Sequence, residues 1–175
     1  MTSAWIRHLR DVPDFPEPGI VFKDIIPVLS SAVAFESAVG DLTALAEPLG
    51  ASAIVGVEAR GFIFGAPVAR QLGTGFVPVR KPGKLPRATR AESYELEYGS
   101  DSVEAHLDAV EAGQGVVIVD DVLATGGTAE ATCRLVEGLG GVVLGVVVLI
   151  ELGFLDGARR LGRHQVHSAL TLGGD

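Results

Sequence analysis

The sequence has little of what several classes of protein require. Its single cysteine, Cys133, rules out an intrachain disulfide. Only 14 Lys and Arg residues stand against 22 Asp and Glu residues, and nonspecific nucleic-acid binding needs many cationic contacts to phosphate. The longest apolar run, Val142–Ile150, is far too short to span a bilayer as a helix. We therefore expect a soluble protein in the cytoplasm, with neither nucleic acid nor a membrane as a partner.

Glycine, in contrast, is plentiful. Many of the 23 glycines lie next to apolar runs, a pattern typical of the tight turns between strands and helices in an α/β fold. The length of 175 residues suits one domain with a sizeable core. We expect a single domain over residues 1–175, in which helices flank a parallel sheet. Its N-terminal segment covers about residues 1–30, and a flexible loop with a β-hairpin covers about residues 80–108.

The spacing of apolar residues and the positions of glycine and proline predict the individual elements. Helices are expected at Ser3–Arg10, Ser30–Leu49, Phe62–Leu72 and Gly127–Leu139. Buried strands are expected at Ala51–Val57, Phe76–Val79, Val116–Val119 and Val142–Ile150, with a further short strand within Arg163–Asp175. Alternating residues predict a two-stranded hairpin from Tyr94–Tyr98 and Val103–Leu107.

The clearest chemical signal is the segment Val116–Thr128, VVIVDDVLATGGT. A buried strand delivers Asp120 and Asp121 to its carboxyl end, the edge at which open α/β sheets bind ligands. Small residues then form a turn into a helix, where N–H groups, hydroxyls and the helix dipole favour an anion: Ala124, Thr125, Gly126, Gly127 and Thr128. Carboxylates repel phosphate but accept hydrogen bonds from ribose hydroxyls or bind a metal that the ligand holds. The segment therefore predicts a sugar-phosphate site.

Other interpretations of this glycine-rich segment find less support. A helix with a capping Asp or Thr explains neither the paired acids nor the sequence Ala-Thr-Gly-Gly-Thr. The chain has no G-x-x-x-x-G-K-[ST] segment, which a Walker-type nucleotide triphosphatase requires. The glycines of Gly138–Gly141 follow a helix and precede a strand, the reverse of a dinucleotide-binding motif, and are predicted to end the helix.

Two basic stretches extend the predicted anion site. Arg60 lies in the turn Gly56–Gly61 between a predicted strand and a predicted helix, which places it at the same sheet edge. The cluster Arg80–Arg87, with Arg90 just beyond, concentrates positive charge in an acidic chain and favours a polyanion such as pyrophosphate. Because like charges repel one another, we expect an ordered conformation of this segment to need the anion or a partner chain.

The segment Val116–Thr128 resembles the phosphoribosyl pyrophosphate (PRPP) binding signature of type I phosphoribosyltransferases. This resemblance implies that Asp120 and Asp121 contact the ribose hydroxyls and that Ala124–Thr128 holds the 5′-phosphate. The signature is specific for the superfamily but leaves the acceptor base open.

Three further segments resemble adenine phosphoribosyltransferases in order and spacing: Gly56–Ala69, Arg80–Arg87 and Ser93–Gly99. By this resemblance Glu97 is the general acid/base on a loop that closes over the substrate, whereas alternation alone places its side chain on a solvated strand face. Arg60 is implied to be catalytic as well as a pyrophosphate ligand. Four residues are implied to bind pyrophosphate, some of them across a homodimer: Arg60, Arg80, Lys81 and Lys84.

The N-terminal segment Phe15–Asp24 resembles the hood that this family places over the base. Phe22 would stack on the purine, although hydrophobicity alone predicts a core position for it. Ile26 departs from the small hydroxyl residue that is frequent in the family. The resemblance implies four contacts to adenine: Val21, Phe22, Lys23 and Leu155.

The family implies a purine salvage reaction, in which adenine and PRPP give AMP and pyrophosphate, with Mg²⁺ arriving on the PRPP. Two alternatives stay open at this point. The same chemistry could act on xanthine, guanine, hypoxanthine or orotate. A PRPP-sensing regulator without catalytic activity is the second, although the acidic chain offers no added basic surface for nucleic acid.

Overall fold

The computed structural model describes residues 3–15, 18, 21–95 and 99–173. The chain divides into two compact units, Met1–Asp41 and Leu42–Asp175. The expectation of one domain over residues 1–175 stays a prediction. None of the helices within the described ranges has the length and apolar character that crossing a bilayer requires.

The first unit contains an antiparallel strand pair and short helical turns. Its elements in chain order are η1 (Ile6–His8), β1 (Arg10–Pro13), β2 (Val21–Asp24), α1 (Ile26–Leu29) and the first part of α2 (Ala32–Ala46). Strand β1 pairs with β2, from Arg10 opposite Asp24 to Pro13 opposite Val21. Trp5 is fully buried, and its indole N–H donates a hydrogen bond of 2.7 Å to the Asp41 carboxylate.

The helix predicted over Ser3–Arg10 is wrong in type and extent. Only a single 3-10 turn forms, and the backbone is already extended at Arg10. So short a segment forms too few hydrogen bonds to offset the cost of helix nucleation. The strand pairing between β1 and β2 therefore decides the conformation at this end of the segment.

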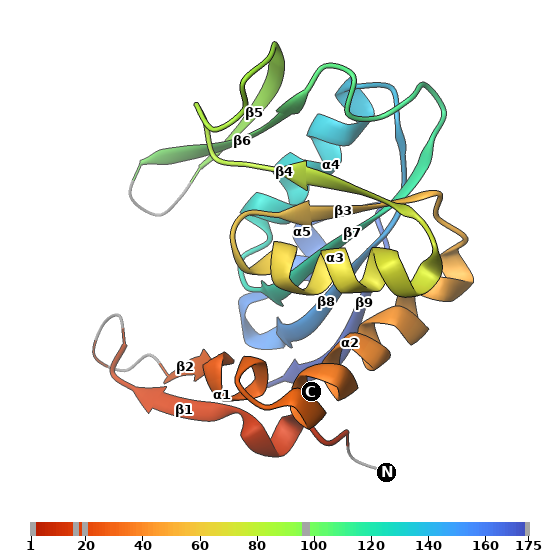
Figure 1. Ribbon diagram of the computed structural model, residues 1–175. Helices are drawn as coiled ribbons and strands as arrows, with labels where there is room; N and C mark the ends of the chain where they lie inside the picture. The colour runs from red at the N-terminus through yellow and green to blue at the C-terminus, as the bar shows by residue number, and fades with distance from the viewer. Residues whose placement is uncertain (1–2, 16–17, 19–20, 96–98, 174–175) are drawn as a thin grey trace. The chain divides into compact units, whose positions relative to one another are not determined.

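A five-stranded parallel sheet organises the second unit (Figure 1). Its strands are β3 (Ala53–Val57), β4 (Gly75–Val79), β7 (Gly115–Leu123), β8 (Val142–Leu152) and β9 (Val166–Leu172), in the spatial order β4-β3-β7-β8-β9. The parallel neighbours β3 and β7 connect toward opposite edges of the sheet, because β3 is followed by β4 on one side and β7 by β8 on the other. Such a switch point leaves a crevice at the carboxyl ends of the two strands, where α/β folds bind ligands.

Helical segments precede or connect these strands. They are η2 (Glu47–Leu49), α3 (Arg60–Leu72), α4 (Gly127–Gly138), η3 (Gly153–Leu155) and α5 (Gly157–Arg160). Gly50 and Gly73 end their helices with φ of 65° and 69°, as the sequence predicted, because glycine accepts the left-handed region without strain. Helix α3 begins at Arg60, two residues before the predicted Phe62. The predicted α/β fold with a parallel sheet is confirmed.

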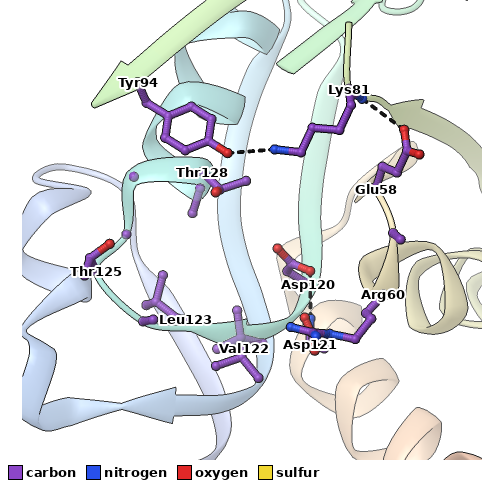
Figure 2. Close-up of a pocket in the computed structure, with 16 residues that line it drawn as sticks. Glu58, Arg60, Lys81, Tyr94, Asp120, Asp121, Val122, Leu123, Thr125 and Thr128 are labelled. Atoms are coloured by element: carbon purple, nitrogen blue, oxygen red, sulfur yellow. Dashed lines mark hydrogen bonds and ion pairs between the residues drawn. The ribbon is translucent and has the colours of Figure 1, made fainter. Parts of the chain in front are cut away.

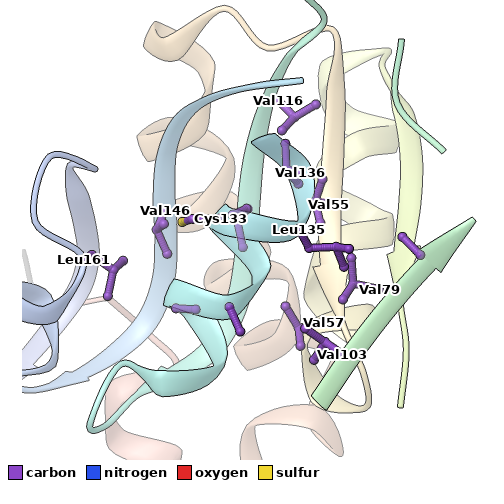
Figure 3. Close-up of a cluster of buried hydrophobic side chains, with 14 of the residues drawn as sticks. Val55, Val57, Val79, Val103, Val116, Cys133, Leu135, Val136, Val146 and Leu161 are labelled. Carbon is purple, nitrogen blue, oxygen red and sulfur yellow. The ribbon is translucent and has the colours of Figure 1, made fainter. Parts of the chain in front are cut away.

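Helices α3 and α4 cover opposite faces of the sheet. They pack against alternate residues of β3, and successive residues of a strand point to opposite sides. Under α3, a Cβ at Gly65 would lie 3.7 Å from Ile54 Cγ2 and 3.4 Å from the Gly56 Cα. Val55 and Val57, the alternate residues of β3, belong instead to the buried cluster that includes the apolar side of α4 (Figure 3). Both faces of β3 are buried, which explains its continuous apolar run.

The predicted hairpin forms, although residues 96–98 of its predicted first strand lie outside the described residues. Its strands are β5 (Thr89–Glu95) and β6 (Ser100–His106), which pair antiparallel with Tyr94 opposite Asp101. The first strand starts five residues before the predicted Tyr94. Apolar and polar residues alternate only weakly around Glu92, so the sequence pattern did not predict a strand there. The strand is defined instead by its pairing with β6.

Candidate active site

The carboxyl ends of β3 and β7 open into one cavity of about 370 Å³ (Figure 2). Arg60 and Lys81 line it from one side. Asp120, Asp121 and all of Ala124–Thr128 line it from the other. The turn Gly56–Gly61 and the segment Val116–Thr128 thus meet at one cavity, as their predicted positions at one sheet edge required.

Asp120 and Asp121 lie inside β7, not beyond its end. The strand was expected to stop at Val119, but it continues to Leu123 and stays paired with β8. Val122 pairs with Ile150, so the apolar pattern on both sides of the acids sustains the ladder. The acids therefore sit on a rigid strand and not on a turn.

The two acids have different surroundings because they point to opposite faces of β7. Asp120 lies close to the first turn of α3, where a Cβ at Gly61 would lie 2.8 Å from its Oδ1 atom. Its Oδ1 also accepts a hydrogen bond of 2.9 Å from the Asp121 N–H. Desolvation and the neighbouring Asp121 carboxylate raise the pKa of Asp120 well above its ordinary value. Asp121 is 4% exposed and forms an ion pair with the Arg60 guanidinium.

The phosphate loop, defined as Ala124–Thr128, is held by close packing. Gly126 has φ of 81°, and α4 starts at Gly127. A Cβ at Gly157 would lie 2.0 Å from the Ala124 carbonyl oxygen, so only glycine fits there. The loop presents the amino end of a helix of 12 residues to the cavity, together with hydroxyl groups from Thr125 and Thr128 (Figure 2). These groups suit an anion.

Glu58, at the turn between β3 and α3, organises the basic segment on the other side of the cavity. Its carboxylate accepts hydrogen bonds of 3.2 and 3.4 Å from the Arg80 guanidinium and of 2.9 Å from the Lys81 N–H. The Lys84 ammonium lies 3.7 Å away. The Lys81 N–H bond is the largest cause that lowers the pKa of Glu58, and Arg80 and Lys84 lower it further against the effect of burial.

Arg80 and Lys84 are not among the residues that line the cavity. Arg80 instead binds Glu58 and donates to the Lys84 carbonyl oxygen at 3.2 Å. Lys81 does reach the cavity, where its ammonium donates to Tyr94 at 2.8 Å and pairs with Asp101. The predicted pyrophosphate roles of these residues stay predictions.

The basic segment, residues 80–90, was expected to need an external anion or a partner chain for order. In the structure the chain itself supplies counter-charges to this segment, and the need for an anion or a partner chain stays a prediction. Each of its five basic side chains pairs with a carboxylate: Arg80 and Lys84 with Glu58, Lys81 with Asp101, Arg87 with Asp108, and Arg90 with Glu92. The Glu104 carboxylate also accepts hydrogen bonds from the Gly83 N–H and the Thr89 hydroxyl.

The roles predicted for the other residues stay predictions. Glu97 lies outside the described residues. Val21, Phe22 and Lys23 belong to the first unit, where the Phe22 ring meets the Phe15 ring edge-on at 5.3 Å and Lys23 pairs with Asp11. Leu155 is 40% exposed on η3 and does not line the cavity.

Sequence reasoning missed three residues that shape the site: Glu58, Tyr94 and Asp101. Glu58 carries a signal in hindsight, since it stands two residues before Arg60 in the same strand–helix turn. Tyr94 and Asp101 meet only through the hairpin pairing, so no local spacing reveals them. Cys133 is buried, and burial raises the pKa of its thiol to about 12, so it is not a nucleophile.

A strand-borne acid pair, a helix-start anion loop and facing cations line one cavity, a combination that suits a ligand with both hydroxyl and phosphate groups. In agreement with this geometry, residues 43–166 match the family described as phosphoribosyl transferase domain. That match covers most of the chain and includes both motifs of the cavity. The class of protein is therefore a phosphoribosyltransferase.

Similar proteins of known name show which family of phosphoribosyltransferases the chain belongs to. The chain is 57% identical to adenine phosphoribosyltransferase of Myxococcus xanthus over 164 residues, which is 94% of this chain and 89% of that protein. Its fold matches the crystal structure of adenine phosphoribosyltransferase from Thermoanaerobacter pseudethanolicus with a TM-score of 0.92 and 53% identity, over 95% and 97% of the two chains. This chain belongs to the adenine phosphoribosyltransferase family.

A more distant structure was solved with ligands. Adenine phosphoribosyltransferase from Saccharomyces cerevisiae, in complex with adenine and an imino-altritol bisphosphate, matches with a TM-score of 0.89 and 40% identity, over 94% and 95% of the two chains. The comparisons do not favour the alternatives of another acceptor base or a PRPP-sensing regulator.

Proposed function

We propose that this chain transfers the phosphoribosyl group of PRPP to adenine, giving AMP and pyrophosphate. One observation carries the proposal: the phosphate loop, two strand-borne acids and two cations face one cavity in a chain of this family. Each part of PRPP has a chemically matched partner there. The ribose hydroxyls meet carboxylates, the 5′-phosphate meets N–H groups, and the pyrophosphate meets cations.

The sugar-phosphate end of PRPP would bind the β7–α4 side. Asp121 and Asp120 would accept hydrogen bonds from the ribose hydroxyls, at the cost of the Arg60 ion pair for Asp121. The 5′-phosphate would lie against Ala124–Thr128, where the packing of Gly157 keeps the loop in place before the ligand arrives. Such preorganisation reduces the entropy lost on binding.

The pyrophosphate end would face Arg60 and Lys81, with Arg80 and Lys84 close behind through Glu58. Cations held there stabilise the charge that develops as pyrophosphate departs from C1′ and the transition state gains oxocarbenium character. Mg²⁺ enters as part of the substrate, bound to PRPP, and its charge adds to that of the cations. Adenine N9 then forms the bond to C1′, and adenine gives up its N7 proton, which we assign to Glu97 as base.

The adenine end is assigned by family resemblance. Phe22 would stack on the base beside Val21 and the Lys23 backbone, and Leu155 would contact the opposite face. Leu155 is 40% exposed, which leaves its side chain accessible for such a contact. We propose a homodimer as the working assembly, with some of the four cationic residues acting across it. A single buried thiol suits a reducing compartment, and we propose the cytoplasm.

A panel of bases tests the reaction. The enzyme is incubated with PRPP and Mg²⁺ and with adenine, hypoxanthine, guanine, xanthine or orotate, and pyrophosphate release is measured. Adenine should give the highest kcat/KM by at least about a hundredfold, because an unpaired polar group on the wrong base is costly in a buried site. Faster turnover with any 6-oxo base would refute the assignment of adenine as the substrate. The absence of pyrophosphate release with every base would refute the proposed activity.

A further inference from the structure

A closed group of three side chains joins the basic segment to the hairpin. The Lys81 ammonium donates a hydrogen bond of 2.8 Å to the Tyr94 hydroxyl and pairs with the Asp101 carboxylate. The Tyr94 hydroxyl in turn donates to the same Asp101 oxygen at 2.9 Å. Tyr94 and Asp101 face each other in the register of β5 and β6. One lysine is thus held by two residues that the hairpin fixes relative to each other.

This group sits at the wall of the cavity. Lys81 and Tyr94 line the cavity, whereas Asp101 is not among the lining residues and holds Lys81 from behind. Figure 2 shows the Lys81 side chain reaching across to the Tyr94 hydroxyl above the phosphate loop. An ammonium has three N–H donors. Tyr94 and Asp101 accept two of them, which leaves one for a ligand oxygen in the cavity.

Lysine needs such support more than arginine does. Its ammonium stands on a flexible four-carbon stem, and ordering that stem costs conformational entropy when a ligand binds. Here the stem is ordered in advance, and the Nζ atom lies 5.3 Å from the centre of the Tyr94 ring, where the ring face attracts a cation. Burial lowers the pKa of Lys81, but the hydrogen bonds from Lys81 to Asp101 and Tyr94 outweigh this and raise it, so the group stays charged.

We propose that Asp101, acting with Tyr94, is a positioning residue that fixes the Lys81 ammonium at the pyrophosphate end of the cavity. The proposal rests on the proposed role of Lys81 as a pyrophosphate ligand. Asp101 touches no substrate in this account and acts only through Lys81.

The opposite effect, in which Asp101 competes with pyrophosphate for Lys81, conflicts with how Asp101 is held. Its Oδ1 atom accepts a hydrogen bond of 2.7 Å from the Ser102 N–H, and its Oδ2 atom accepts the bond from Tyr94. The hydrogen bond from Lys81 is the largest cause that lowers the pKa of Asp101, and the bonds from Ser102 and Tyr94 lower it further against the effect of burial. A carboxylate fixed by its own strand and by Tyr94 keeps its place when a ligand reaches the third N–H donor of Lys81.

The test measures the Kd of magnesium pyrophosphate by calorimetry, and KM for each substrate, in the full-length protein. Asp101→Asn should weaken pyrophosphate binding about fivefold to tenfold, and Tyr94→Phe about twofold to threefold, because each loosens a preorganised cation. KM for PRPP should rise in parallel while KM for adenine stays unchanged, a split that general destabilisation does not produce. The matched control is Asp108→Asn, which removes an exposed partner of Arg87 and should leave the Kd unchanged.

A double-mutant cycle separates the two levels of the proposal. Lys81→Met should weaken pyrophosphate binding strongly, and adding Asp101→Asn to it should have no further effect. If Lys81→Met alone leaves the Kd unchanged, the proposed role of Lys81 fails. If Lys81→Met weakens binding but Asp101→Asn binds as the wild type or more tightly, the positioning role of Asp101 fails. Melting temperatures identify a variant that does not fold, and Tyr94→Phe then provides the same test.

Discussion

The two sides of the cavity prepare for an anion in different ways. The phosphate loop, Ala124–Thr128, offers main-chain N–H groups and hydroxyls, and it is held by the contact of Gly157 with its backbone. The basic segment, residues 80–90, offers cations, each already paired with a carboxylate of the same chain. One side is fixed by shape and the other by internal charge balance.

This difference teaches two ways in which a site can present donors and cations to a highly charged ligand. Neutral donors fixed by packing need no counter-ion, so the phosphate loop can stay open to the cavity. Cations crowded on one segment repel one another unless acids such as Glu58 and Asp101 lie among them. The site therefore carries carboxylates on both sides, although its ligand is an anion.

The largest expected effect comes from the cation closest to both sides. Arg60→Ala should lower kcat/KM for PRPP by about 10²–10³-fold, because it removes charge that is aimed at the departing pyrophosphate. Steady-state kinetics with varied PRPP measure this. The control is Arg70→Ala, an exposed arginine in the last turn of the same helix, which should leave kcat/KM unchanged. Equal effects of the two substitutions on kcat/KM would contradict a role of Arg60 in stabilising the departing pyrophosphate.

The shape of the phosphate loop can be broken without changing any charge. Gly157→Ala places a Cβ 2.0 Å from the Ala124 carbonyl oxygen, so the loop must move. We expect a loss of about 1–3 kcal/mol in the free energy of unfolding. We also expect KM for PRPP to rise about tenfold, since a displaced loop loses part of its hydrogen bonding to phosphate. Gly75→Ala, whose Cβ would meet only Ala53 at 3.9 Å, is the matched control for chemical denaturation and kinetics. Wild-type behaviour of Gly157→Ala would show that packing does not hold the loop.

The charge balance of the basic segment can be tested by pH. The folded pKa of Glu58 lies below its ordinary value of 4.5, so its carboxylate stabilises the fold fully at neutral pH and loses this effect as the pH falls through the folded pKa. Glu58→Gln should therefore cost about 1–2 kcal/mol at pH 7, and the difference from the wild type should shrink in acid. Denaturant unfolding from pH 7 to pH 3 measures it. A difference that stays constant over this range would contradict the assignment.

The smallest effect is expected at the outer end of the basic segment. Arg87 is exposed, pairs with the exposed Asp108, and does not line the cavity. Arg87→Ala should change the Kd of magnesium pyrophosphate by less than about twofold, because an exposed charge is screened by solvent and salt. A loss as large as that of Lys81→Met would mean that the whole segment, and not its cavity end alone, binds pyrophosphate.

Much of the fold and the phosphate side could be predicted from sequence because the signals are local. The apolar runs located the parallel strands, and the glycines after η2 and α3 located the ends of these helical segments. The strand around Asp120 was predicted too short because acids inside a buried strand resemble the end of the strand.

The basic side could not be predicted in the same way, because its partners come from distant parts of the chain. Glu58 and Arg80 are 22 residues apart, and Lys81 and Asp101 are 20 apart. Only the sheet edge and the hairpin pairing bring these charges together. The local charge pattern of the sequence therefore identified the cations but not their carboxylate partners. Glu97 lies outside the described residues, and its role stays a prediction.

A crystal structure of the protein with AMP tests the central claim most directly. The 5′-phosphate should lie against the N–H groups of Ala124–Thr128, with the ribose hydroxyls on Asp120 and Asp121 and the Arg60 ion pair to Asp121 broken or lengthened. A phosphate bound instead to Lys81 and Arg60, with Ala124–Thr128 empty, would contradict the account, because the two sides of the cavity would then have exchanged their roles.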